Sequence, residues 1–280
     1  MHSPLISPMI SPEELSEIEG DVVILDARPG QADYDAGHLR GAIHVDLETQ
    51  LSAAREPGAN PARGGRHPLP DPQRFAKLLG EWGIGPSTQV VVYDDQSGAN
   101  AAARAWWMLR ALGHEQVAVV DGGFRAAGAA GLDVTTEVPV PVAREPYPAE
   151  AWTLPTVDMQ RVDELRRDDS WKVLDVRSAE RYRGETEPID PVAGRIPGAV
   201  NLPFAQNLEN GRFKSAEELR AQYERLLDGT AADHLVVHCG SGVTACHTLL
   251  ALEPAGLEGA ALYVGSWGEW CRNPMSRAGS

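Results

Sequence analysis

A weak internal duplication constrains the fold of this chain more than any other feature of its sequence. An apolar run that ends in Asp-x-Arg occurs twice, at Asp26 and at Asp175, 149 residues apart. Three more matched landmarks follow in the same order, at 37–42 and 194–199, 90–94 and 235–239, and 119–124 and 262–267. Two domains of ordinary size also suit a chain of 280 residues. The sequence therefore predicts two copies of one domain.

Each copy alternates strand-like apolar runs with helix-like segments. This alternation predicts the α/β class, with a mainly parallel sheet flanked by helices in each copy. Ser11, followed by proline and then glutamate at the third helical position, predicts a helix start. Ser215 is expected to cap a helix over 216–227, and another helix is expected over 101–112.

The predicted organisation has three parts. Residues 1–137 form the first copy and residues 156–280 form the second. Residues 138–155 lie between them and carry alternating prolines, which hold a chain extended, so they are interpreted as a semi-rigid linker.

Composition excludes several classes of protein. The net charge of −15 argues against nucleic acid as a partner, because neutralising phosphates needs a basic surface. No apolar run is long enough to span a membrane, so no membrane partner is expected. Residues 1–10 lack the basic and apolar regions of a signal peptide. Three cysteines without metal-ligand spacing predict a cytoplasmic protein with no metal and no cofactor.

Cys239 has the most reactive surroundings that the sequence predicts. It follows the apolar run 235–237, which is interpreted as a strand, and it precedes a helix-like segment. Gly240 and Gly242 let backbone N–H groups turn inward, and the helix N-terminus adds positive charge. Cysteines in such places have thiol pKa values lowered from about 8.5 to about 3.5–7.5, which makes them nucleophilic. A buried structural cysteine is the alternative interpretation.

Residues 239–245, Cys-Gly-Ser-Gly-Val-Thr-Ala, resemble the active-site loop of the rhodanese superfamily of sulfurtransferases. Within it the loop is most similar to that of the 3-mercaptopyruvate sulfurtransferases and their bacterial relatives. The resemblance extends over nearly the whole chain and implies two tandem rhodanese-like domains, of which the second is catalytic. Asp94 stands where the first copy would carry the cysteine, so that copy cannot form a persulfide.

The resemblance also implies a catalytic set. Cys239 would carry the sulfur as a persulfide, and Ser241, a histidine and an acid from the first domain would relay protons. The histidine is His67, which a bland interpretation makes an exposed loop residue. The acid is Glu48, where the family usually has aspartate.

The segment Arg-Tyr-Arg-Gly at 181–184 resembles the family motif whose first arginine, here Arg181, holds the anionic group of the substrate. A guanidinium suits this role because its fork pairs with a carboxylate through two hydrogen bonds. Arg183 is a helper or a solvated surface residue. A second family arginine, which follows in a Glu-Pro-Glu-Pro-Arg run, is missing from 187–191, and Arg195 is a candidate to compensate. Backbone contacts to the substrate are expected from Gly240, Gly242, Val243 and Thr244.

The predicted function is transfer of sulfur from 3-mercaptopyruvate through a Cys239 persulfide to cyanide or to a thiol acceptor, such as thioredoxin or a small thiol. Thiosulfate is the alternative donor, although Gly240 and Ser241 offer little charge for a dianion. A cysteine phosphatase would need arginine where Ala245 stands. A non-catalytic sulfur carrier or binding module is the remaining alternative.

Overall fold

A computed structural model describes residues 7–18 and 21–273, so most of the segment 1–10 lies outside the described residues. The chain divides into two compact units, each built from three stretches. The first unit comprises Met1–Ser52, Pro70–Thr153 and Asn210–Phe213, and the second comprises Ala53–Leu69, Leu154–Glu209 and Lys214–Ser280. The predicted ranges 1–137, 138–155 and 156–280 were continuous, whereas these units are not. No helix among the described residues has the length and apolar character needed to cross a bilayer.

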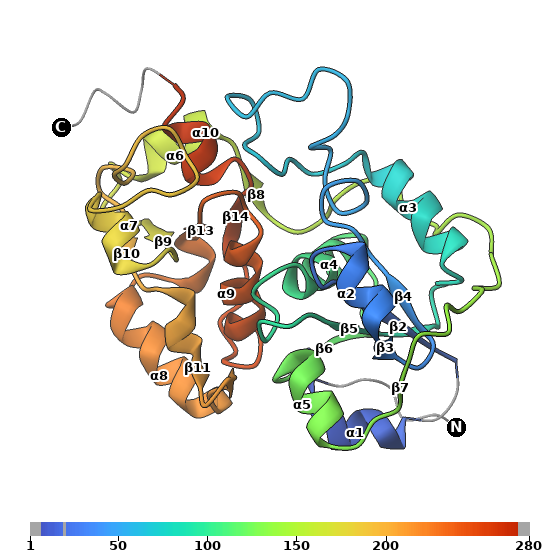
Figure 1. Cartoon of the computed structure of the whole chain (residues 1–280). Coiled ribbons are helices and arrows are strands. Elements are labelled where there is room, and N and C mark those ends of the chain that lie inside the picture. Colours follow the sequence, from blue (N-terminus) through green and yellow to red (C-terminus); the bar gives the residue numbers. More distant parts are fainter. Residues whose placement is uncertain (1–6, 19–20, 274–280) are drawn as a thin grey trace. The chain divides into compact units, whose positions relative to one another are not determined.

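The first unit is built on a five-stranded parallel sheet in the order β1-β6-β5-β2-β4 (Figure 1). Its strands are β1 (Met9–Ile10), β2 (Val22–Asp26), β4 (Ala42–His44), β5 (Gln89–Tyr93) and β6 (Val117–Val120). A small antiparallel pair joins β3 (His38–Leu39) to β7 (Val134–Thr135), and β12 (Arg212–Phe213) also belongs to this unit.

The helices of the first unit are α1 (Pro12–Glu17), α2 (Gln31–Ala36), α3 (Pro72–Glu81), α4 (Ala102–Ala111) and α5 (Gly123–Ala129). Two of them, α1 and α4, correspond to the two that the sequence predicts there. Ser11 forms the expected capping box on α1, and α4 is the helix expected over 101–112. Val91 and Tyr93 of β5 pack in one core cluster with Leu15 of α1 and Ala127 of α5.

The second unit has its own five-stranded parallel sheet, in the order β10-β9-β13-β14-β8. The strands of this sheet are β8 (Thr156–Val157), β9 (Lys172–Asp175), β10 (Val200–Asn201), β13 (Leu235–His238) and β14 (Ala261–Tyr263), and the unit also contains β11 (Leu208–Glu209) outside the sheet. Its helices are α6 (Met159–Leu165), α7 (Ala179–Arg183), η1 (Phe204–Asn207), α8 (Ala216–Leu227), η2 (Ala232–His234), α9 (Thr244–Leu252) and α10 (Ser266–Trp270). Ser215 caps α8 as predicted. Reversed, the order of the second sheet is β8-β14-β13-β9-β10, which corresponds strand by strand in chain order to β1-β6-β5-β2-β4 of the first sheet. The duplication is therefore confirmed.

The repeated Asp-x-Arg pairs make the same contacts in both units. Arg28 Nη2 lies 2.6 Å from Asp26 Oδ2, and Arg177 Nη2 lies 2.6 Å from Asp175 Oδ2. Each arginine also donates to the carbonyl oxygen of the glycine that begins the next landmark, at 2.7 and 2.8 Å. All four side chains are buried. These pairs hold the sheet to the following loop and are structural.

Candidate functional site

The Cys239 loop connects the middle strand of the second sheet to a buried helix. Strand β13 ends at His238, and α9 begins at Thr244 with Val243 as its N-cap (Figure 1). Residues 245–252 of α9 are all buried, so no face of this stretch of the helix is exposed. The loop therefore lies at the carboxyl edge of a parallel sheet and at a helix N-terminus, the two places where such folds bind anions.

Backbone contacts fix the position of the Cys239 thiol. Its sulfur accepts a hydrogen bond from the Ser241 N–H at 3.4 Å, and its side chain is 3% exposed. The Cys239 N–H donates to Ser266 Oγ at 3.2 Å. The Cys239 carbonyl oxygen accepts from the Trp267 N–H at 3.0 Å. The loop thus presents a sulfur in a place set by its own backbone and by α10.

Gly242 is required for this loop conformation. Its φ of +74° is in the left-handed region, and a Cβ added there would lie 2.5 Å from the Val264 carbonyl oxygen. Ser241 and Val243 on either side are buried, and Thr244 is half-buried. Gly242 and its buried neighbours therefore form one tight turn between Cys239 and α9.

Two guanidinium groups lie over Gly240, the residue after the cysteine. A Cβ built on Gly240 would be 2.9 Å from Arg66 Nη2 and 3.4 Å from Arg181 Nη2. The side chains of Arg66 and Arg181 are 21% and 18% exposed. The sequence predicted Arg181 at the site but assigned no role to Arg66. The one hint in the sequence was that Arg66 directly precedes His67. Its approach to Gly240 could not be predicted, because the two residues are 174 positions apart in the chain.

Two buried carboxylates orient these arginines. Asp190 Oδ1 lies 3.2 Å from Arg66 Nε and 2.8 Å from Arg272 Nη1, and Asp190 Oδ2 lies 3.8 Å from Arg181 Nη2. Glu187 Oε1 lies 2.6 Å from Arg181 Nη2. Although burial acts to raise the pKa of Glu187, hydrogen bonds from Arg181 and backbone N–H groups bring it below its ordinary value.

The two other arginines singled out by sequence lie at the surface. Arg183 is 48% exposed and pairs with Glu185 at 2.6 Å. Arg195 is exposed, and its guanidinium lies 4.9 Å from the ring centroid of Tyr182. Arg195 was a candidate for the missing family arginine, and these contacts give no support to that role. Arg66, by contrast, lies over Gly240.

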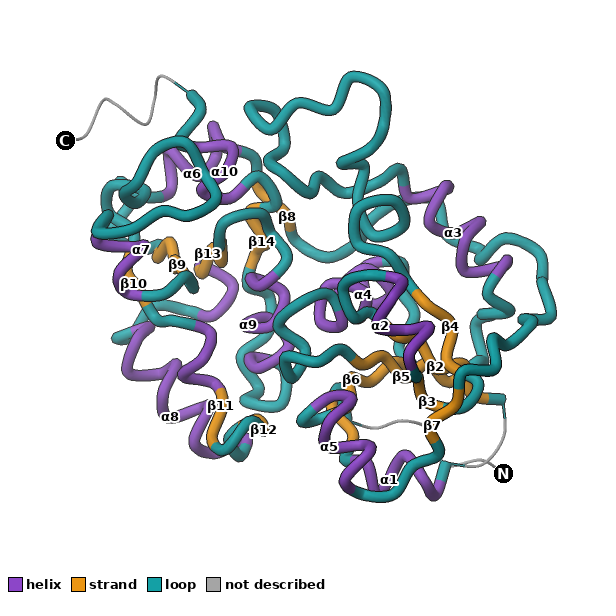
Figure 2. Tube along the Cα trace, viewed as in Figure 1, coloured by secondary structure: helices purple, strands orange, loops and turns teal. Residues whose placement is uncertain are grey.

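The predicted relay residues are divided between the two units. His67 is buried in Ala53–Leu69, a stretch of the second unit, whereas the bland interpretation would have left it exposed. Figure 2 shows this stretch, between β4 and α3, as a loop throughout. Glu48 belongs to the first unit, where its carbonyl oxygen accepts a hydrogen bond from the Ser52 hydroxyl at 3.2 Å. Their joint action with Ser241 remains a prediction.

The Cys246 thiol donates to the carbonyl oxygen of Gly242 in the Cys239 loop at 3.3 Å. Cys246 and Cys271 are buried, and no disulfide links the cysteines of the chain. Burial raises the pKa of the Cys271 thiol. Within residues 7–18 and 21–273, no three His, Cys, Asp or Glu side chains are grouped as metal ligands.

The first unit carries a loop of the same kind after β5, with Asp94 in the place of the cysteine. The Asp94 side chain is buried, and its carboxylate accepts hydrogen bonds from five backbone N–H groups. The donors are Gln96 at 2.9 Å, Gly98 at 2.8 Å, Asn100 at 3.0 Å, Ala101 at 3.2 Å and Ala102 at 3.1 Å. Burial raises the pKa of Asp94, and these donors act in the opposite direction. The anion cradle of this copy is occupied by its own side chain.

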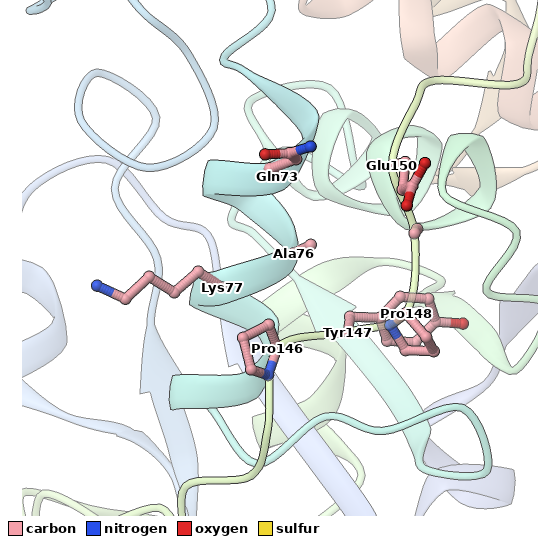
Figure 3. A pocket seen from close by; sticks show the side chains of 8 residues that line it. Gln73, Ala76, Lys77, Pro146, Tyr147, Pro148 and Glu150 are labelled. Atoms are coloured by element: carbon pink, nitrogen blue, oxygen red, sulfur yellow. The ribbon is translucent and has the colours of Figure 1, made fainter.

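A pocket in the first unit lies between α3 and an extended segment at 146–150 (Figure 3). Its charged lining residues are Lys77 and Glu150, and Figure 3 shows the Lys77 side chain pointing away from that segment. Lys77 instead pairs with Glu81 at 3.6 Å. The lining contains no cysteine, serine or histidine, so this pocket lacks the nucleophile that the Cys239 loop provides.

Comparisons with known proteins agree with this geometry. The rhodanese-like domain family matches residues 11–130 and 158–273. A Pseudomonas aeruginosa protein named "Probable 3-mercaptopyruvate sulfurtransferase" is 43% identical over 91% of both chains. The thiosulfate sulfurtransferase of Bos taurus is 37% identical over 87% of this chain and 80% of its own. The structure of 3-mercaptopyruvate sulfurtransferase from Leishmania major superposes with a TM-score of 0.81, at 30% identity, covering 97% of this chain and 77% of its own.

Proposed function

The chain belongs to the rhodanese-like domain family, whose relatives above are sulfurtransferases, and we propose that it takes sulfur from 3-mercaptopyruvate as a persulfide on Cys239. As an enzyme it is thus a sulfurtransferase. The observation that carries the proposal is the Cys239 loop itself. A buried sulfur that accepts a hydrogen bond from a backbone N–H, followed by a glycine over which two guanidinium groups lie, suits a nucleophile that attacks an anionic donor.

In the first half-reaction the Cys239 thiolate attacks the sulfur of 3-mercaptopyruvate. A sulfur–sulfur bond forms and the carbon–sulfur bond of the donor breaks. Its electron pair leaves on carbon as the enolate of pyruvate, which takes up the proton lost from the donor thiol. Cys239 is left as a persulfide anion, and the total charge is unchanged.

We assign the roles within this step as follows. Arg181 holds the donor carboxylate, and backbone N–H groups of Gly240, Ser241, Gly242, Val243 and Thr244 stabilise the sulfur anion. Ser241, His67 and Glu48 move the proton toward the enolate carbon. Arg183 has the weakest claim, because it is exposed and already paired with Glu185.

In the second half-reaction an acceptor attacks the outer sulfur and releases the Cys239 thiolate. Cyanide would leave as thiocyanate, and a thiol such as thioredoxin or a small thiol would leave as a persulfide. No cofactor enters this scheme, since the sulfur and the electrons both come from the donor. We place the reaction in the cytoplasm, where three unpaired cysteines stay reduced.

Thiosulfate is the second candidate donor, favoured by the identity with the Bos taurus enzyme. Only the sulfur-donor half of the reaction would change, since sulfite rather than pyruvate enolate would leave. The loop itself carries no side-chain cation, because Gly240 and Ser241 stand there. We therefore rank 3-mercaptopyruvate first.

The test is steady-state turnover of both donors with cyanide as acceptor. We expect a larger kcat/KM for 3-mercaptopyruvate, with pyruvate and thiocyanate formed in equal amounts, and no turnover by Cys239→Ser. A larger kcat/KM for thiosulfate would reverse the order of the donors. Unchanged turnover in Cys239→Ser would disprove the persulfide.

A further inference from the structure

Two arginines, rather than one, lie close to Gly240 in the Cys239 loop. Arg66 Nη2 and Arg181 Nη2 both lie within 3.4 Å of one point, the position of a Cβ on Gly240. Arg66 comes from the Ala53–Leu69 stretch and Arg181 from α7, so the two side chains approach this point from different segments of one unit. Two planar donors that converge on one point fit an oxyanion with two or more oxygens.

Among the residues that the structure describes, the linked ion pairs around this point contain one more guanidinium group than carboxylate groups. Linked pairs run from Arg66 and Arg272 through Asp190 to Arg181, and on through Glu187 to Arg177 and Asp175. This network contains four guanidinium groups and three carboxylates: Arg66, Arg177, Arg181, Arg272, Asp175, Glu187 and Asp190. The arginines and carboxylates are mostly buried, so the excess charge is weakly screened and attracts an anion.

We propose that Arg66 is a second donor-binding residue, which acts with Arg181 as a two-guanidinium clamp on the carboxylate of the sulfur donor. Asp190 is the positioning residue of the clamp, because its carboxylate contacts both arginines. This inference rests on the proposed function and adds to it the residue that selects the donor's anionic group.

The clamp accounts for the missing arginine in the 187–191 segment. The sequence has Asp190 in the run where the resemblance led us to expect a second cation. An aspartate there, fully buried, requires cations around it, and Arg66 is one of them. The cation is therefore supplied from the Ala53–Leu69 stretch instead of from the segment after α7.

A purely structural role for Arg66 would be to attach the Ala53–Leu69 stretch to α10. Two other contacts already do this. The Gly64 N–H donates to Glu269 Oε1 at 2.7 Å, and Asn273 Nδ2 donates to the Ala62 carbonyl oxygen at 3.0 Å. These anchors do not involve Arg66, whose Nε faces Asp190 while its Nη2 lies over Gly240.

The test compares Arg66→Met with Arg63→Met, which removes an exposed arginine from the same stretch. We expect Arg66→Met to raise KM for 3-mercaptopyruvate about tenfold or more, because a hydrogen bond to a charged group is lost, with kcat changed less than about threefold. Arg63→Met should match the wild type. Arg66→Lys should recover part of the loss, since lysine keeps the charge but not the fork.

Inhibition by the product pyruvate separates the two roles of Arg66, because a purely structural role would not change the inhibition constant of pyruvate selectively. We expect the inhibition constant of pyruvate to rise about tenfold in Arg66→Met, and that of its uncharged amide to stay unchanged. Asp190→Asn should weaken pyruvate binding as well, because both arginines lose their anchor. A one-sulfur mass gain at saturating donor in Arg66→Met shows that the persulfide chemistry itself is intact.

Two outcomes would overturn the clamp. One is a KM and a pyruvate inhibition constant within twofold of the wild type in Arg66→Met. The other is an equal loss for pyruvate and its amide. If the wild type gains no sulfur at all, the proposed function fails instead, and the mass measurement separates the two failures.

Discussion

The Asp94 loop and the Cys239 loop are two versions of one structure that differ in what occupies the anion position. In both, the first loop residue follows the middle strand, and its carbonyl oxygen accepts a hydrogen bond from a later aromatic residue. Phe124 N–H donates to Asp94 at 2.8 Å, and Trp267 N–H donates to Cys239 at 3.0 Å. The difference is that Asp94 brings its own negative charge, held by five N–H donors.

This difference shows what the fold supplies and what the residue supplies. In the first copy the loop and the start of the helix supply five N–H donors to one carboxylate, and in the second copy the Ser241 N–H donates to the Cys239 sulfur. The Asp94 carboxylate satisfies those five donors with a charge that belongs to the protein. Under the proposed function, the Cys239 sulfur takes the corresponding place and carries the second sulfur of a persulfide.

The largest effect on stability is expected from Asp94→Ala, which would break the first loop. It leaves five N–H donors without their acceptor in a buried place, at a cost of about 3–5 kcal/mol in the free energy of unfolding. Urea unfolding monitored by circular dichroism measures this loss. Asp95→Ala, an exposed neighbour, is the control and should change stability by about 0.5 kcal/mol or less. Equal effects of the two variants would refute the role given to Asp94.

An intermediate effect on stability is expected from Gly242→Ala, which changes the Cys239 loop as Asp94→Ala changes the Asp94 loop. Alanine at φ +74° and against the Val264 carbonyl oxygen costs about 1–3 kcal/mol and moves the Ser241 N–H away from the sulfur. The rate of persulfide formation in single-turnover experiments should fall. Gly229→Ala also has a positive φ, +85°, but meets no atom within 4 Å. The idea fails if both variants load sulfur at the wild-type rate.

The smallest effect on stability is expected from a change of pH, through two buried histidines. His238, fully buried beside Cys239, has a pKa lowered by desolvation, and burial lowers the pKa of His114 in the first unit. Below the ordinary histidine value of about 6.5, the unfolded chain therefore binds protons that the folded chain does not. Stability should fall as the pH drops from 7.5 to 5.5, and His238→Gln should reduce that slope. An unchanged slope would contradict this origin.

The sequence predicts the fold well because the signals are local and repeated. The capping box at Ser11, the cap at Ser215 and the paired Asp-x-Arg landmarks depend on residues close together in the chain. The matched order of those landmarks then predicts two similar sheets, and the strand orders agree.

The sequence predicts the site less completely, for a physical reason. Cys239 and its glycines belong to one local turn, so their pattern identifies them. Arg66 lies in a stretch without helix or strand, and its contact with Gly240 depends on where that stretch packs. No periodicity or spacing encodes such a contact. The sequence offered Arg195 as a candidate for the missing cation, and its guanidinium lies 4.9 Å from the ring centroid of Tyr182.

The most direct test of the proposed persulfide on Cys239 is the intact mass of the protein after incubation with 3-mercaptopyruvate and removal of excess donor. We predict a gain of one sulfur atom that maps to the peptide containing Cys239, disappears on addition of cyanide and is absent from Cys239→Ser. A protein that turns over the donor without this gain, or that gains the sulfur on Cys246 or Cys271, would contradict it.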